Sequence, residues 1–134
     1  MRFLTAVVVS TLLFACSRDR EAQSVFSDME KLQTDVRTAI EHSPDEAGLA
    51  LAEAAVAKSA PGLRDRMTSL RGASLSPATL GAMPERCALN EAAAFTGAAY
   101  VKQGLHKRNA PQAERERLGL RLDKLKTDLH DICK

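Results

Sequence analysis

The chain has 134 residues and a nearly balanced charge, with 19 lysines and arginines against 17 aspartates and glutamates. It contains no tryptophan, one tyrosine and four phenylalanines. A nucleic-acid-binding surface needs concentrated basic charge and aromatic rings that stack on bases, so this composition argues against one. The same scarcity of aromatic rings argues against an aromatic sugar-binding platform. The length predicts one domain with one core.

The first 15 residues have the layout of a secretory leader. Arg2 supplies the positive start, an apolar run extends from Phe3 to Ala15, and small Ala15 precedes Cys16. The apolar run is shorter than the roughly 20 residues that span a bilayer. The sequence therefore predicts a removable leader at residues 1–15, with an uncleaved anchor as the alternative.

The residues around Cys16 resemble the lipobox of bacterial lipoproteins, in which the cysteine after the cut is acylated. Leu13 and Ala15 match the aliphatic and small positions of that motif. The resemblance implies a lipid, such as palmitate, on Cys16, whereas a plain secreted protein has none. Ser17, the residue after the cysteine, resembles the residue at that position in lipoproteins that are sorted to the outer membrane of Gram-negative bacteria. This similarity implies an outer-membrane anchor facing the periplasm, with residues 16–22 as a short tether to a domain at 23–134.

Apolar residues at steps of three and four predict a first helix from about Glu21 to His42. Ser43 is then the expected N-cap of a second helix, with Pro44 at its first position and Glu46 completing a capping box. The first stripe comprises Val25, Met29, Leu32, Val36 and either Ala39 or Ile40.

The second stripe keeps its helical phase across Pro61. We therefore expect one helix kinked between Ala57 and Pro61, with a break at Ser59 as the alternative. Its members are Leu49, Ala52, Val56, Ala60, Leu63, Met67 and Leu70.

Two prolines and Gly81 make the segment from Ser74 to Pro84 a connection, with one helical turn after Ser76 and Pro77 as a further option. Glu85 is expected to open a third helix. Gly97 and Gly104 each cost this helix about 1 kcal/mol of propensity, so tertiary packing must hold it. Its expected core face is rich in alanine and comprises Ala88, Ala92, Ala94, Phe95, Ala98, Ala99, Val101 and Leu105.

Asn109 to Gln112 is the expected cap of a fourth helix, whose apolar residues repeat as in a coiled-coil seam. No segment alternates with period two, so the chain is predicted to be all-α. Short links at Ser43 and Asn109 favour an up-down-up-down four-helix bundle. The fourth stripe comprises Leu118, Leu122, Leu125, Leu129 and Ile132.

Once Cys16 is assigned to lipid, Cys87 and Cys133 remain as a pair in an oxidising compartment. Cys87 lies about 33 Å before the turn at Asn109, and Cys133 lies about 36 Å after it, at 1.5 Å per helical residue. Both sulfurs thus reach the same level of a helical hairpin. The sequence predicts one disulfide between helices three and four.

No nucleophile with a base, converging carboxylates, phosphate loop or metal-ligand spacing is present, so the chain is not expected to be an enzyme or to hold a metal. A basic cluster at the start of the fourth helix is a candidate partner surface, and a simple solvated helix start is the alternative. The cluster comprises Lys107, Arg108, Arg115 and Arg117.

Met29 in the first helix and His130 near the end of the fourth resemble the ligand placement of the four-helix periplasmic b-type cytochromes. That resemblance implies a haem-b electron carrier or sensor. The spacing of His130 and Cys133 opposes it, because residues three apart share a flank, so His130 should face helix three and leave Met29 without its partner. The leading expectation is a non-enzymatic, lipid-anchored bundle that binds another envelope protein or peptide.

Overall fold

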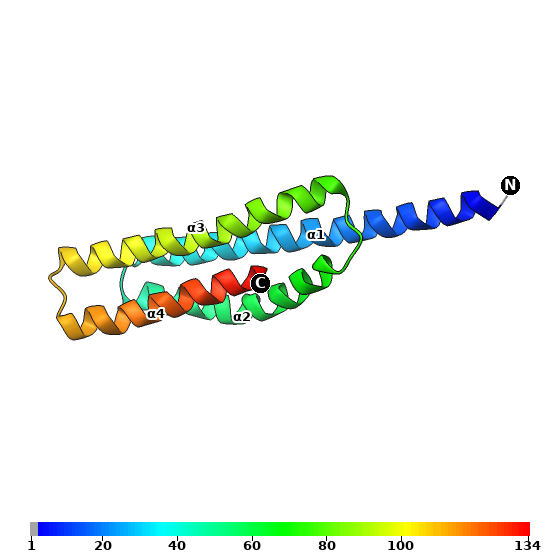
Figure 1. Ribbon diagram of the computed structural model, residues 1–134. Helices are drawn as coiled ribbons and strands as arrows, with labels where there is room; N and C mark the ends of the chain where they lie inside the picture. The colour runs from blue at the N-terminus through cyan, green and yellow to red at the C-terminus, as the bar shows by residue number, and fades with distance from the viewer. Residues whose placement is uncertain (1–2) are drawn as a thin grey trace.

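The computed structural model describes residues 3–134, with side chains from Ser17 onward, so the predicted leader and the side chain of Cys16 lie outside the described side chains. Four helices follow one another and alternate in direction (Figure 1). This architecture confirms the predicted all-α, up-down-up-down bundle. No helix among the described residues has the length and apolarity to cross a membrane. The elements are α1 (Phe3–His42), α2 (Glu46–Arg71), α3 (Pro77–Lys107), α4 (Gln112–His130) and a terminal 3-10 turn, η1 (Asp131–Cys133).

The helices pack in a square in which consecutive helices are not always neighbours. Helix α1 packs against α2 and α3, and α4 packs against α3 and α2. The consecutive helices α2 and α3 thus lie across the diagonal, and residues 72–76 connect them at one end (Figure 1). The N-terminal part of α1 extends beyond that end.

The predicted stripes of α1, α2 and α4 form the core. The residues of those three stripes are buried, with Ile40 rather than Ala39 as the last core member in α1, and Met29 is only 1% exposed. The apolar area that these side chains remove from water is the main stabilising contribution to the fold. Ala22 and Phe26 extend the core toward the α2–α3 connection.

Helix α2 is a single helix with Pro61 inside it, as predicted, but its cap differs from the prediction. Asp45, not Ser43, is the N-cap: its carboxylate accepts hydrogen bonds from the N–H groups of Ala47 at 3.0 Å and Gly48 at 3.2 Å. The N–H of Ser43 instead donates to the carbonyl of Ala39 and closes the last turn of α1. Asp45 is as good a capping residue as Ser43, and Ser43 is not free to cap α2 because its backbone still closes α1.

Helix α3 begins at Pro77, so the predicted start at Glu85 is wrong. The Ser76 hydroxyl accepts from the N–H of Thr79, and Pro77 occupies the first turn, where its missing N–H costs nothing. Ala82 and Met83 pack against the core and hold the first turns in place. Pro84 is accommodated inside the helix.

The α3–α4 hairpin is present, but Asn109 does not cap α4 as predicted. Asn109 has a φ of 48° and ends α3, with its N–H donating to His106 and that of Ala110 donating to Leu105. This left-handed residue closes the helix in the manner of a C-terminal cap. Helix α4 starts after Pro111 without a side-chain cap.

Candidate functional site

The disulfide between Cys87 and Cys133 joins α3 to the turn that follows α4, with a Cα–Cα distance of 5.9 Å. The predicted pairing is confirmed. Because α3 begins at Pro77, Cys87 lies in the third turn of that helix rather than at its base. Helix α4 consequently ends short of the end of the bundle where α2 and α3 are connected (Figure 1).

The arginines of the predicted basic surface are engaged within the molecule. Arg108 pairs with Glu114 and so lowers the pKa of that carboxyl below its ordinary value. Arg117 pairs with Glu46 of α2, and its hydrogen bond lowers the pKa of Glu46 in the same way.

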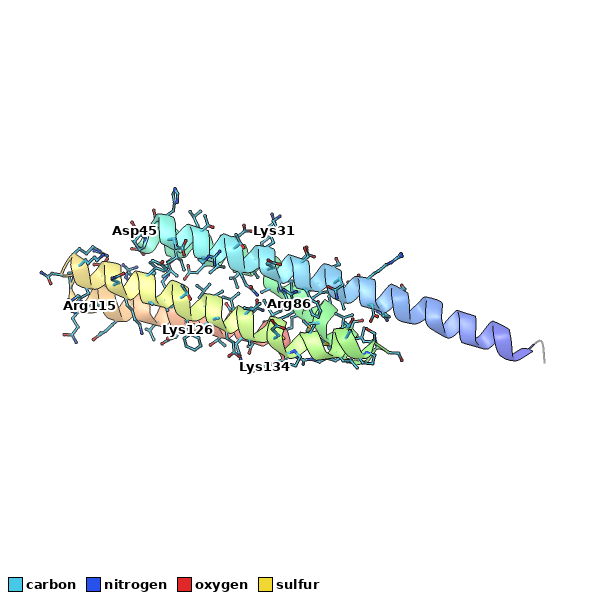
Figure 2. The ribbon with its side chains drawn as sticks, turned by 90° about the horizontal axis from the view of Figure 1, so that it is seen from above. Lys31, Asp45, Arg86, Arg115, Lys126 and Lys134 are labelled. Carbon is cyan, nitrogen blue, oxygen red and sulfur yellow. A yellow bond between two sulfur atoms is a disulfide. The ribbon has the colours of Figure 1, made fainter. Side chains whose placement is uncertain are left out.

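Arg115 donates from Nε to the carbonyl of Ala110 at 2.8 Å. This acceptor is a main-chain oxygen, so Arg115 and Lys107 both lack an ionic or hydrogen-bonding partner among the described side chains. Figure 2 places Arg115 and Asp45 at the same end of the bundle, so acidic groups stand among these cations. Arg108 and Arg117 are therefore engaged in ion pairs, whereas Arg115 and Lys107 form no ion pair with the described side chains.

Met29 and His130 face different surroundings. Met29 lies in the core, whereas His130 is on the surface between α3 and α4 and its Nδ1 contacts the carboxylate of Glu91. The orientation of His130 toward α3 follows the expectation from its spacing with Cys133. The two side chains do not converge on one site, so this arrangement does not fit a pair of axial haem ligands. Among the residues with described side chains, no group of three or more histidines, cysteines or carboxylates gathers as a metal site.

One surface stands out by its low charge, and it lies on α3. Between Ala88 and Tyr100 the single charged residue is Glu91, which contacts His130 at the edge of this surface. Leu89 is 44% exposed, Phe95 is 63% exposed and Tyr100 is 40% exposed. We call this surface the α3 face; its exposed members are uncharged and comprise Ala88, Leu89, Ala92, Phe95, Thr96, Ala99 and Tyr100.

The aromatic side chains single out the same surface. Residues 17–134 contain three aromatic residues, of which Phe26 is buried while Phe95 and Tyr100 are exposed on the α3 face. Large exposed aromatic groups are typical of binding surfaces. The Nζ of Lys126, from α4, lies 5.5 Å from the centre of the Phe95 ring, a cation–π distance.

The prediction that Phe95 belongs to the core is wrong. Ala94, Gly97 and Ala98 supply the buried surface of α3 at this level, and they approach α1 so closely that a Cβ on Gly97 would lie 2.9 Å from Ile40. Such a narrow space has no room for an aromatic ring, and Phe95 lies one position off the buried stripe. The same phase argument turns Ala88, Ala92 and Ala99 outward.

Two hollows border the α3 face. One of about 300 Å³ lies between α1 and α3, where Leu89, Ala92 and Thr96 face Gln33 and Arg37. The other, of about 330 Å³, lies between α3 and α4 and is lined by residues that include Phe95, Lys126 and His130. The face is thus an apolar ridge between two shallow grooves, a shape that suits packing of another helix.

The α3 face exposes Leu89, Phe95 and Tyr100 beside small uncharged residues, a composition common at contact surfaces between proteins. Its signal was present in the sequence: from Ala88 to Val101 the only charged residue is Glu91. Leu89 and Tyr100 are also out of helical phase with Ala94 and Val101, which are buried.

Comparison with protein-family models, with curated proteins and with solved structures gives no match to this chain.

Proposed function

We propose that this protein is a non-enzymatic, lipid-anchored component of a bacterial cell envelope, and that its α3 face binds a helix of another envelope protein. The anchor is proposed from Cys16 and the leader that precedes it. Placement at the outer membrane, facing the periplasm, follows from Ser17 and is part of the proposal. The single observation that supports binding is the exposure of Phe95 and Tyr100 on a surface of low charge.

The composition of the α3 face favours a helical partner. Ala92, Thr96 and Ala99 are small, so the axis of a second helix can approach within the usual distance of about 8–10 Å. Leu89, Phe95 and Tyr100 are large enough to pack as anchors against the surface of that second helix. Helix-in-groove recognition uses such apolar anchors at helical spacing.

The borders of the face favour a partner with acidic flanks. Arg37, Arg86 and Lys126 line the two bordering hollows, against Glu30 and Glu91. Glu91 contacts His130, Arg37 pairs with Glu41 and Lys126 pairs with Asp123, which leaves Arg86 as the border cation without an ion pair among the described side chains. We therefore propose an amphipathic partner helix whose apolar stripe is flanked by carboxylates.

Photo-crosslinking in intact cells tests the binding surface. A benzophenone amino acid at Phe95 is expected to trap one discrete product. The same group at Leu51, which is 64% exposed on α2, serves as the matched control and is expected to trap none. Mass spectrometry must place the crosslinked residue on an acidic amphipathic helix of the partner. A product made of two copies of this chain, or identical products from both positions, would contradict the proposal.

Charge reversal separates the α3 face from the basic cluster that the sequence suggested. Arg86→Glu at the border of the face is expected to weaken the crosslink at position 95, because it repels an acidic partner. Lys107→Glu, at the α3–α4 hairpin, is expected to leave it unchanged. If Lys107→Glu weakens the crosslink and Arg86→Glu does not, the partner contacts the α3–α4 hairpin rather than the α3 face.

The anchor has its own test. Intact-mass analysis of the native protein is expected to show an acylated N-terminal Cys16, and Cys16→Ala is expected to release the protein from the membrane fraction. An unmodified N-terminus would contradict the lipid anchor and leave the helix-binding proposal standing.

A further inference from the structure

The end of the bundle where α2 connects to α3 is tied to α1 immediately after the proposed lipid site. The carboxylate of Asp19 accepts a hydrogen bond from the N–H of Ser76 at 3.0 Å, and Ser76 caps α3. Helix α1 is continuous through Cys16 and Asp19, so the two lie about 4.5 Å apart along the helix axis. The α2–α3 connection is thereby held within about one turn of the level of Cys16.

A second set of contacts joins α2 to the same part of α1. Arg66 of α2 donates to Glu21 at 2.8 Å and to Asp28 at 2.6 Å, both on α1. Ala22 and Phe26 of α1 are buried beside these pairs. The segment expected to be a tether, residues 16–22, is helical and enters the packed bundle by Asp19. An anchor at Cys16 therefore sets the orientation of the whole bundle as well as its location.

The side chains at this end suit an anionic lipid surface. Arg18, Arg20 and Arg71 are exposed, and none of them pairs with a side-chain carboxylate among the described residues. One N–H group of Arg71 donates to the main-chain oxygen of Lys134, which leaves the rest of its guanidinium open to solvent. The acids nearby are engaged inside the molecule, Asp19 with Ser76 and Glu21 with Arg66.

An apolar side chain accompanies these cations. Leu80, in the first turns of α3, is 51% exposed. Pro77 and Ala78, in the same turn, are also exposed and uncharged. Basic residues next to exposed apolar ones are the combination that binds the interface of an anionic bilayer.

We infer that the α2–α3 end of the bundle lies against the headgroups of an anionic phospholipid bilayer, with Arg18, Arg20 and Arg71 on the phosphates and Leu80 inserted at the interface. This inference depends on the proposed acylation of Cys16. The bundle then stands on the membrane on this end, with the α1–α2 and α3–α4 loops directed away from it. The α3 face runs along the side of the upright bundle, open to a partner in the periplasm.

Tryptophan fluorescence provides the test because the chain has no tryptophan of its own. Leu80→Trp reports on the α2–α3 end. Leu120→Trp, at a side chain that is 74% exposed on α4 toward the opposite end, is the matched control. The full acylated protein is purified from membranes and reconstituted into vesicles of brominated phosphatidylcholine, with and without phosphatidylglycerol.

The fluorescence of the Leu80→Trp variant is expected to fall by about twofold or more in the brominated vesicles, as for a side chain at interfacial depth, and that of the Leu120→Trp variant is expected to stay unchanged. Phosphatidylglycerol should increase the quenching. Exchange of Arg18, Arg20 and Arg71 for glutamine should reduce it without altering the melting temperature. If Leu80→Trp lowers the melting temperature, Ala78→Trp in the same turn replaces it as reporter.

Two negative results have different meanings. Protein that is acylated and floats with the vesicles, yet shows no quenching at position 80 or equal quenching at 80 and 120, overturns the docked orientation and leaves the anchor intact. Protein whose N-terminus carries no acyl chain overturns the anchor and this inference with it.

Discussion

Helices α3 and α4 form one hairpin, yet their outward surfaces are opposite in kind. On α4, Arg121 pairs with Glu53 of α2, Lys124 pairs with Asp128 and Lys126 pairs with Asp123. On α3, Glu91 is the only charged residue between positions 88 and 100. Exposed ion pairs contribute little stability, so the charges of α4 mainly keep its surface solvated. The apolar face of α3 is not needed for the fold and is therefore the better candidate for binding.

The glycines of α3 and α4 also differ, in how closely other parts of the chain approach them. A Cβ on Gly104 of α3 would lie 2.6 Å from the carbonyl oxygen of Pro44 in the α1–α2 loop, whereas a Cβ on Gly119 of α4 would meet nothing within 4 Å. Gly104 permits the loop to approach the helix. Gly119 only lowers helix propensity. Helix α3 is thus in close contact with its neighbours on one side and exposed to solvent on the other.

The largest expected effect comes from breaking the covalent link between the two helices. Replacing Cys87 and Cys133 by serine should lower the free energy of unfolding by about 4 kcal/mol, because the disulfide closes a long loop and restricts the unfolded chain. Urea denaturation measures the loss. Reduction of the unsubstituted protein is the control and should produce a similar decrease. A change below about 1 kcal/mol would mean that packing alone holds the end of α4.

The glycine comparison predicts changes of opposite sign. Gly104→Ala should destabilise the protein by about 1–3 kcal/mol, because the methyl group forces the Pro44 loop away from α3. Gly119→Ala should stabilise it by about 1 kcal/mol through helix propensity. Thermal denaturation of both variants, followed by circular dichroism, decides the matter. Equal effects at the two positions would show that close approach does not explain Gly104.

The link between Asp19 and Ser76 should depend on pH. The hydrogen bond from the Ser76 N–H lowers the pKa of Asp19 below its ordinary value of 3.8. The charged form is therefore favoured by folding. The stabilisation is complete at neutral pH and is lost as the pH falls below 3.8 through the lowered pKa of the folded state.

Asp19→Asn should accordingly have a lower melting temperature than the unsubstituted protein at pH 7 and the same melting temperature in strong acid. Asp65→Asn, at an exposed acid of α2 with no ion pair among the described side chains, is the control and should show no such dependence. A melting-temperature difference for Asp19→Asn that is constant across this pH range would exclude the charge as its cause.

The smallest expected effect on stability is at the α3 face itself. Phe95→Ser should change the free energy of unfolding by no more than about 0.5 kcal/mol, because the ring is exposed. Leu125→Ala, in the buried stripe of α4, should cost about 2–5 kcal/mol and serves as the contrast. With the photo-crosslinker moved to Tyr100, Phe95→Ser should nevertheless reduce the crosslink. Lost stability at Phe95 would place the ring in the fold rather than in binding.

The sequence was sufficient for much of the fold. Period-3.6 stripes identified the buried residues of α1, α2 and α4, since a helix can hide only one face. Distance along two helices was sufficient to pair Cys87 with Cys133. The sequence predicted the ends of the helices less well than their buried faces. Ser43 and Asp45 can both cap a helix, and which of them does so depends on where α1 ends.

The sequence predicted less of the candidate site than of the fold. Alanine is compatible with either a buried or an exposed position, so the alanine-rich segment around Phe95 did not reveal which side of α3 faces inward. The ion pairs of Arg108 and Arg117 could not be predicted from the sequence either. The partner of Arg117, Glu46, lies on another helix, and only the fold brings the two side chains together. The sequence therefore shows the basic cluster as a candidate surface without showing that Arg108 and Arg117 have carboxylate partners.

By itself the sequence determined the helical class, the three strong apolar stripes and the disulfide, because each depends on local spacing along the chain. Only the tertiary structure decided that α2 and α3 lie across the diagonal, that residues 16–22 belong to α1 and that Phe95 and Tyr100 face solvent. The physical reason is that side-chain exposure depends on which helices are neighbours. That choice is made by packing between residues far apart in the chain.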